Sequence, residues 1–560
     1  MQAIEYLIKR FITEDVKHLF MVPGGHVDPM LVAFEACPEF QAIVAGHESG
    51  ATYMADGYAK VSGKFGIAAG IGGPGLTNMM TGITTAYSDH TPIFVITGEP
   101  PTYMEGRGAF QDTSDGSYNS NIFLTPVTNK HLAVTELAQL EPQIDSLFHN
   151  MLGTNPGPVQ LDFPKDLQPK DVDITTLRKL PDSLYHPRIL DQNTCDKTWD
   201  FLRGASKIAI LAGMGSLFSE ATDELIRFAE TYEIPVATTL GGKGVFPENH
   251  RLSLGVLGWF GNPYAMETLH GDEIEVLIVL GSRLNQTSTV KWSPTLKPKK
   301  ALVLNDIEAN AYYANYQPDH FVLGDSQTFL RALNTAQQQQ ILLETVTERK
   351  KWLEQIRKSG PNFYNIEHFS SDLIPIHPAR VIKELRQVMP ENTILFSGEG
   401  ASGFIASHYW TTYGPRQHFS QVKYMSPMGW SIAAAIGGKV AKPNVPVVAI
   451  IGDGSMLMHG LEIQTAARYG LAVIFIVFNN GAHGNPQLRA RQVGQFQADF
   501  LKLPVHDWAK IAEGLGVIGI SVTKPEQLNA AFTQALALNK AVLIDVQTGN
   551  YDNAEQRSPF

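Results

Sequence analysis

The chain has 560 residues, enough for about three or four domains that each bury a hydrophobic core. Apolar residues make up 44% and charged residues 18%, as in globular proteins with well-buried sheets. The net charge of −11 without a basic tract argues against a nucleic-acid partner. Two cysteines are too few for a disulfide framework or a zinc cluster, and this low number fits a reducing, cytoplasmic setting.

The first expected element is a helix at the N-terminus, where Ile4, Leu7, Ile8 and Phe11 lie on one face. No basic segment leads into an apolar core there, so we expect no signal peptide. No apolar run reaches the length of about 18 residues that spans a bilayer. We therefore expect a soluble protein without a membrane partner.

Three α/β segments follow one another, separated by two polar linkers that contain prolines. Short apolar runs alternate with helical patterns, which predicts an α/β fold of three doubly wound, parallel-sheet domains. We divide the chain into domains at 1–170, 190–340 and 370–560. The expected strands include 93–97, 208–211, 236–239, 276–280, 301–304, 445–451 and 471–478.

In the first segment, a strand is expected to lead into a helix from Glu48 to Lys60 that ends before Gly63. An acid in the first helical turn is common, because it interacts favourably with the helix dipole. About 25 residues later a second cluster follows, running from Gly73 to Asn78 (GPGLTN). This pairing makes Glu48 a candidate functional residue.

Polar residues follow two neighbouring strands of the third segment. The run 445–451 ends in Gly-Asp-Gly-Ser with Asp453, and the run 471–478 ends in Asn-Asn with Asn480, 27 positions after Asp453. A right-handed strand–helix–strand unit brings both to the same carboxyl edge of the sheet. Acid and amide oxygens suit Mg²⁺, and glycines let backbone N–H groups approach a diphosphate. Each tripeptide alone is a common turn, but the pair predicts a metal–diphosphate site.

This pair resembles the diphosphate-binding signature of thiamine diphosphate enzymes. Further segments, 157–166, 243–250 and 324–325, resemble acetolactate synthase-like members of that family. The resemblance implies pyrimidine-binding, middle and diphosphate-binding domains, in that order. It also implies thiamine diphosphate and Mg²⁺ as cofactors, bound between two chains. A homodimer would be the minimum active unit, and a homotetramer is common.

The resemblance also implies roles for individual residues. Asp453, Asn480 and the backbone carbonyl of Ala482 would bind the metal. Glu48, buried, would share a proton with the pyrimidine ring and so activate the cofactor. The implied cofactor-binding residues are Glu48, Gly73, Asn78, Ser426, Met428, Gly452, Asp453, Gly454, Ser455, Asn480, Ala482, His483 and Gly484.

Two of these residues precede a helix of the third segment. By resemblance, Met428 would wedge under the bent cofactor, and the Ser426 carbonyl would accept a hydrogen bond from its amine. On sequence alone, Met428 is equally well explained as a core methionine.

Two residues bear on the reaction. Phe110 and Gln111 resemble a pair in acetolactate synthases, whereas His26 departs from that enzyme and resembles benzaldehyde lyase and cyclohexanedione hydrolase. In those enzymes His and Gln relay protons, and imidazole suits this near neutral pH. A His in a capping loop is an equal alternative. The catalytic candidates are Glu48, His26 and Gln111.

We therefore expect a transferase or lyase, and three hypotheses remain. The first is a decarboxylating carboligase that acts on 2-oxo acids. The second is an acyloin or diketone lyase or hydrolase, and the third a non-catalytic cofactor-binding relative, against which Glu48 argues. Flavin is not expected, since the run 213–218 lacks the last glycine of a dinucleotide fingerprint and 284–289 lacks an Asp/Arg-rich run.

Overall fold

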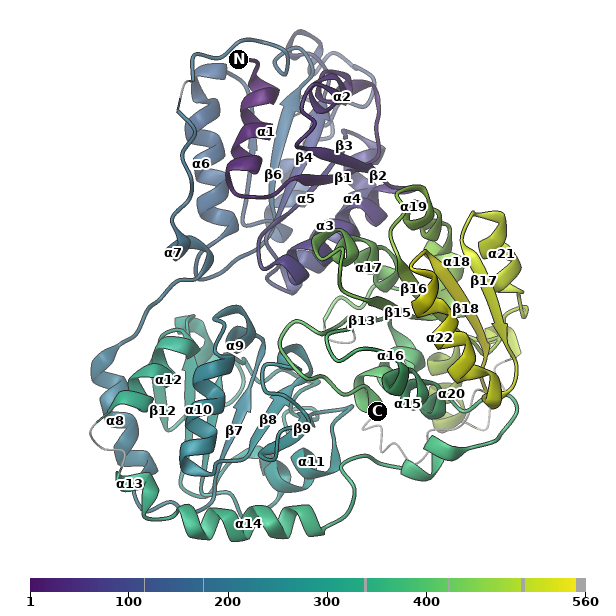
Figure 1. The fold of residues 1–560 in the computed structure, drawn as a ribbon. Helices are drawn as coiled ribbons and strands as arrows, with labels where there is room; N and C mark the ends of the chain where they lie inside the picture. The colour runs from purple at the N-terminus through teal and green to yellow at the C-terminus, as the bar shows by residue number, and fades with distance from the viewer. Residues whose placement is uncertain (115, 175, 337–339, 422–423, 495–498, 550–560) are drawn as a thin grey trace.

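The computed structural model describes residues 1–114, 116–174, 176–336, 340–421, 424–494 and 499–549. It contains three six-stranded sheets, in which the paired strands are parallel, each with flanking helices (Figure 1). Sheets of this kind are covered on both faces, so their strands are almost wholly apolar. The predicted fold class is confirmed. The domain limits at 1–170, 190–340 and 370–560 remain our proposed division.

The N-terminal sheet has the order β2-β1-β3-β4-β6-β5. Chain direction across the sheet reverses between β1 and β3, where the carboxyl ends of neighbouring strands open a crevice. Its strands are β1 (His18–Met21), β2 (Gln41–Val44), β3 (Gly66–Ile71), β4 (Ile93–Glu99), β5 (Lys130–Ala133) and β6 (Val159–Pro164). The helices are α1 (Ala3–Thr13), α2 (Asp28–Glu35), α3 (Glu48–Ser62), α4 (Pro74–Ser88), α5 (Asn121–Leu124) and α6 (Leu140–Met151), and α7 (Asp182–Tyr185) lies in the linker.

The middle sheet has the order β12-β11-β10-β7-β8-β9, with the reversal between β7 and β10. Its strands are β7 (Ile208–Ala212), β8 (Val236–Thr239), β9 (Ser253–Leu257), β10 (Val276–Leu280), β11 (Ala301–Asp306) and β12 (His320–Leu323). The helices of this part are α8 (Gln192–Leu202), α9 (Met214–Phe218), α10 (Thr222–Tyr232), α11 (Pro263–His270), α12 (Ser326–Thr335), α13 (Gln340–Leu343) and α14 (Val346–Lys358).

The C-terminal sheet has the order β14-β13-β15-β16-β18-β17. Its strands are β13 (Ile394–Ser397), β14 (His418–Ser420), β15 (Val447–Gly452), β16 (Val473–Asn479), β17 (Ile518–Val522) and β18 (Val542–Gln547). The helices are α15 (Pro378–Val388), α16 (Gly400–Tyr409), α17 (Trp430–Ala441), α18 (Asp453–His459), α19 (Ile463–Arg468), α20 (Gly484–Val493), α21 (Trp508–Gly514) and α22 (Leu528–Leu538).

All seven predicted strands are present, with ends that shift by at most two residues. The strand predicted at 445–451 begins at Val447, directly after Pro446. Proline cannot donate a hydrogen bond to a central ladder, so it limits the strand at this end.

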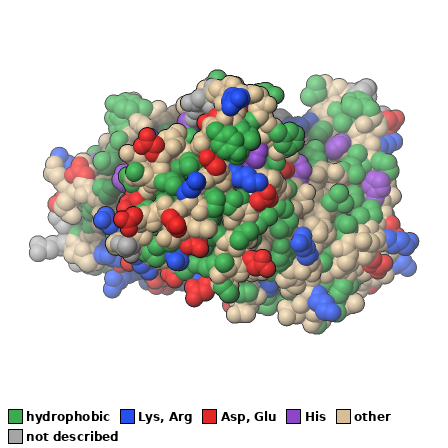
Figure 2. Space-filling view, turned by 90° about the horizontal axis from the view of Figure 1, so that it is seen from above, with side chains coloured by type: hydrophobic (Ala, Val, Ile, Leu, Met, Phe, Trp, Pro, Cys, Tyr) green, Lys and Arg blue, Asp and Glu red, His purple; other side chains and the backbone are tan. Residues whose placement is uncertain are grey.

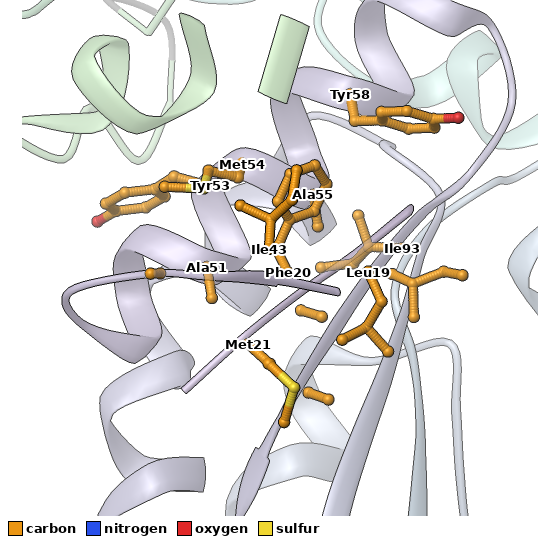
Figure 3. Packing of buried hydrophobic residues seen from close by; sticks show 14 of the residues in the cluster. Leu19, Phe20, Met21, Ile43, Ala51, Tyr53, Met54, Ala55, Tyr58 and Ile93 are labelled. Carbon is orange, nitrogen blue, oxygen red and sulfur yellow. The ribbon is translucent and has the colours of Figure 1, made fainter. Parts of the chain in front are cut away.

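Helix α3 is buried from Ser49 to Val61 because it packs on two sides. On one side it covers the N-terminal sheet, where apolar side chains of β1, β2 and β4 lie against it (Figure 3). Tyr53 projects away from these strands in the same view. On its second side α3 packs on α17 of the C-terminal domain, so one helix joins the two domains.

The contact between α3 and α17 is a backbone-to-backbone approach. A Cβ atom on Gly57 would lie 2.1 Å from the carbonyl oxygen of Ala434, and one on Gly437 would lie 1.9 Å from that of Met54. Backbone atoms cannot rotate away as a side chain can, so both positions require glycine.

Gly57→Ala is accordingly expected to lower the free energy of unfolding by about 1–3 kcal/mol, the usual cost of overpacking a close contact. Gly514→Ala is the matched control, since a Cβ there meets no atom within 4 Å. We expect the control to be neutral or slightly stabilising. Denaturant midpoints measure both, and a wild-type midpoint for Gly57→Ala would contradict the packing described.

Charge is interspersed on the face that Figure 2 shows, with Lys and Arg beside Asp and Glu and apolar side chains between them. That face therefore carries no large field of one sign. Among the helices of the described residues, none is both long enough and apolar enough to cross a membrane.

Candidate functional site

At the carboxyl edge of the C-terminal sheet, Asp453 lies next to the loop that follows β16. Strands β15 and β16 pair in parallel with Gly452 opposite Phe478, so the residues that follow each strand emerge side by side. Asp453 is the first residue of α18 and is 3% exposed. Its Oδ2 accepts a hydrogen bond from the Gly481 N–H at 2.7 Å, and its Oδ1 accepts one from the Gly454 N–H at 2.8 Å. Asp453 therefore contacts the loop that carries Asn480.

A cavity of about 300 Å³ opens at this edge, a size typical of ligand pockets. Every residue that the sequence proposed in the C-terminal domain lines it. These are Ser426, Met428, Gly452, Asp453, Gly454, Ser455, Asn480, Ala482, His483 and Gly484.

The oxygen atoms at this edge fit a divalent cation. Burial raises the pKa of Asp453, while the N–H groups of Gly481 and Gly454 counteract the shift. A bound cation would favour the carboxylate further. Asn480 Oδ1 accepts the Ala482 N–H at 3.2 Å and keeps a second lone pair. The described residues contain no cluster of three His, Cys, Asp or Glu, but the proposed ligands include only one such side chain. Hard oxygens of this type suit Mg²⁺.

The floor of the cavity is shaped for a close approach to the backbone. A Cβ atom on Gly454 would lie 3.0 Å from both the Met428 Cε and the His483 Nδ1. The Met428 side chain thus reaches into the cavity instead of a core. Ser426 has a left-handed backbone (φ +51°), and Gly429 (φ +88°) opens α17. These residues fit a diphosphate beside the glycines and a ring system above Met428.

Glu48 and Asn78 meet at the carboxyl edge of the N-terminal sheet. Glu48 is the first residue of α3, as predicted, and the helix ends before Gly63. The Asn78 Nδ2 on α4 donates to the Glu48 Oε2 at 2.9 Å. The resemblance implied a buried carboxyl, whereas within a single chain Glu48 is half-buried. Gly73, with φ +64°, directly precedes α4.

His26 and Gln111 lie at the same edge. His26 follows β1 in a short 3₁₀ helix, Gly25–Val27, and its buried Nδ1 has no hydrogen-bond partner within the described residues. Burial, and next the nearby Lys165, lower the pKa of His26, so its ring is neutral at pH 7. Gln111 has φ +59°, and its backbone carbonyl lies 2.7 Å from where a Cβ on Gly72 would be.

The predicted residues therefore form two sets, one on each terminal domain. None of the N-terminal set lines the C-terminal cavity. The N-terminal set contains His26, Glu48, Gly73, Asn78 and Gln111.

One acid of the cavity was missed in the sequence. Glu399 follows β13, lines the cavity and is 8% exposed. Its Oε2 accepts the Gly429 N–H at 3.2 Å, directly beside Met428. Burial raises the pKa of Glu399 to about 8, so it is uncharged at pH 7. The sequence did contain a signal for Glu399. A Gly-Glu-Gly follows β13, and it has the same form as the Gly-Asp-Gly that contains Asp453.

A second cavity lies where β7 and β10 diverge in the middle domain. Gly215, Ser282, Arg283 and Asp306 line it, together with His90 from the N-terminal domain. Burial raises the pKa of Asp306 to about 6. None of the proposed site residues lies here.

The three parallel-sheet domains and the cavity at the edge of the C-terminal sheet fit enzymes that bind a diphosphate cofactor at such an edge. Comparisons with known proteins identify the class. Residues 1–118 match the N-terminal TPP (thiamine pyrophosphate) binding domain of thiamine pyrophosphate enzymes, 195–333 match their central domain, and 398–546 match their C-terminal TPP binding domain.

Relatives match along the whole chain. A probable acetolactate synthase large subunit of Methanocaldococcus jannaschii is 32% identical over 559 residues, covering 98% of this chain and 92% of the relative. The acetolactate synthase large subunit of Corynebacterium glutamicum is 29% identical, over 95% and 84% of the two chains, and the isozyme 3 large subunit of Escherichia coli is 27% identical, over 98% and 94%. The chain belongs to the thiamine pyrophosphate enzymes, and within this family it is acetolactate synthase-like.

Proposed function

We propose that the protein is a decarboxylating carboligase that uses thiamine diphosphate and Mg²⁺ and acts on 2-oxo acids. The contact of Asp453 with the 480–482 loop, inside one cavity, is the observation that carries this proposal. The relatives named above, all acetolactate synthase large subunits, support the substrate class.

The residues of the cavity have separate roles in this proposal. Asp453, Asn480 and the Ala482 carbonyl hold the metal, and the backbone around Gly454 binds the diphosphate. Met428 supports the rings. When bound, thiamine diphosphate supplies an electron sink for cleavage of the bond next to the substrate carbonyl.

In the N-terminal set, Glu48 holds and exchanges a proton, and Asn78 fixes its orientation through the 2.9 Å hydrogen bond. A second chain that covers the half-exposed carboxyl would exclude bulk water from it and so restrict proton exchange to the bound cofactor.

We also propose that a homodimer is the active unit and that dimers pair into a tetramer. The two sets of residues do not share a cavity in one chain, so a second copy is needed to bring Glu48 to a metal site. Large apolar side chains are exposed near both sets, including Phe110 at 79% and Leu461 at 70%. Apolar groups exposed in this way favour a protein partner. A cytoplasmic location is in keeping with the two free cysteines.

A second candidate is cleavage of an acyloin or diketone, and His26 favours it. Its neutral ring and buried Nδ1 suit a group that takes a proton from a substrate hydroxyl and returns it. The chain is an enzyme by family, so the non-catalytic hypothesis is set aside.

Incubation with thiamine diphosphate, Mg²⁺ and single 2-oxo acids or acyloins tests the two reactions. We expect CO₂ and a carboligation product from pyruvate, identified by mass. If the enzyme cleaves an acyloin but releases no CO₂ from any 2-oxo acid, the proposed carboligase activity would be wrong. We propose that the protein binds no flavin, and the absorption spectrum of the purified protein tests this.

A further inference from the structure

A row of buried polar side chains lies on one face of the N-terminal sheet. Strands β4 and β6 pair in parallel with Thr97 opposite Asp162, and side chains alternate along a strand. Thr97, Glu99 and Asp162 therefore share a face, together with Gln160. All four are buried, and the Gln160 Nε2 donates both to the Thr97 Oγ1 at 2.8 Å and to Asp162.

The two carboxyl groups of this row bind the chain that follows Gln111. Thr113 donates both its N–H, at 3.0 Å, and its hydroxyl to Glu99. The Ser120 hydroxyl donates to Asp162 at 3.1 Å. Glu99 and Asp162 thus bind this loop at two positions, Thr113 and Ser120.

Glu99 also touches the turn that leads into α4. A Cβ atom on Gly72 would lie 2.7 Å from the Glu99 Oε1 and 2.7 Å from the Gln111 carbonyl oxygen. The absence of a side chain at Gly72 lets Glu99, Gln111 and the start of α4 meet. Glu99 and the backbone of Gln111 therefore both lie against Gly72, the residue before Gly73.

We propose that Glu99 is a positioning residue of this enzyme, a buried acid that anchors the Gln111 loop beneath the cofactor cleft through its two hydrogen bonds with Thr113. The part played by Gln111 rests on the proposed function, whereas the hydrogen bonds and the protonation of Glu99 do not.

The charges around Glu99 are consistent with a neutral acid. Burial, and next the neighbouring Asp162, raise the pKa of Glu99 to about 8, although the two donors of Thr113 oppose the shift. Asp112 adds further negative charge from the loop and also interacts electrostatically with His26. A pKa of about 8 means that Glu99 keeps its proton at pH 7.

Infrared spectra of the unloaded protein test the proton directly. The difference between wild type and Glu99→Gln at pH 7 should show the carbonyl stretch of one protonated acid, replaced by carboxylate above about pH 8. In Asp162→Asn that transition should move to lower pH, because the neighbouring charge is gone. A carboxylate band at pH 7 would overturn the protonated state of Glu99, and an unmoved transition in Asp162→Asn would overturn the influence of Asp162 on it.

Kinetics test the positioning. At pH 9 only about a tenth of Glu99 keeps its proton, so kcat/KM for a 2-oxo acid should fall about tenfold from pH 7 in the wild type. Glu99→Gln should largely lose this fall, since an amide stays neutral and can still accept from the Thr113 N–H. Glu99→Ala should lose activity at every pH while the affinity for thiamine diphosphate, followed by tryptophan fluorescence, stays near wild type.

An equal alkaline fall in Glu99→Gln and wild type would show that Glu99 does not position the loop. If the wild type turns over no 2-oxo acid at all, the proposed function is wrong. The infrared spectra would still decide whether Glu99 is protonated at pH 7.

Discussion

Glu48→Gln is expected to lower the kcat for a 2-oxo acid by about 10²–10⁴-fold, the range that proton transfer by a positioned side chain contributes. The amide cannot exchange a proton but keeps the shape of the acid, and its oxygen can still accept the hydrogen bond of Asn78. The metal and diphosphate residues lie in the other domain. Binding of Mg²⁺ and thiamine diphosphate should therefore remain near wild type.

Single-turnover kinetics and a cofactor titration on the same preparation separate the two effects. Glu35→Gln, a change of the same type at an exposed position on α2, serves as the control and should leave both unchanged. Asn78→Ala should give a smaller loss, because the carboxyl remains but is no longer held. Wild-type turnover in Glu48→Gln would remove Glu48 from the catalytic set.

Asp453→Asn is expected to weaken Mg²⁺-dependent binding of thiamine diphosphate by at least about 100-fold. Loss of a residue that merely supports a metal ligand costs about 10–100-fold, and a direct, charged ligand should cost at least as much. The unloaded variant should still fold, with a free energy of unfolding within about 1–2 kcal/mol of wild type, because the amide escapes the desolvation cost of a charge but can accept only one of the two N–H bonds that Asp453 accepts.

Calorimetric titration measures the binding, and denaturant unfolding without cofactor measures the stability. Asp173→Asn, at an exposed position, is the control and should change neither. Cofactor binding at wild-type strength in Asp453→Asn would place the metal elsewhere. A loss of folding in the unloaded variant would instead assign Asp453 a structural role.

Short-range patterns determined much of the fold. The strands at Val236–Thr239 and Val276–Leu280 have the predicted ends, because compact apolar runs in alternation with helices are typical of buried parallel strands. Where one helix joins two such strands, handedness alone places the following residues together. The meeting of Asp453 with the loop of Asn480 was predictable for this reason.

What the sequence by itself determined is thus the α/β fold, the sheet edge at which Asp453 meets the loop of Asn480, and the family resemblance. Only the tertiary structure decided that Glu99 and Asp162 share one buried face of the sheet and that Glu399 lies beside Met428. It also decided that Glu99 and Glu399 are uncharged at pH 7. The proton on a carboxyl group depends on burial and on neighbours brought from distant segments, such as strands β4 and β6. No local pattern encodes that environment, since it exists only once the sheets and helices have packed.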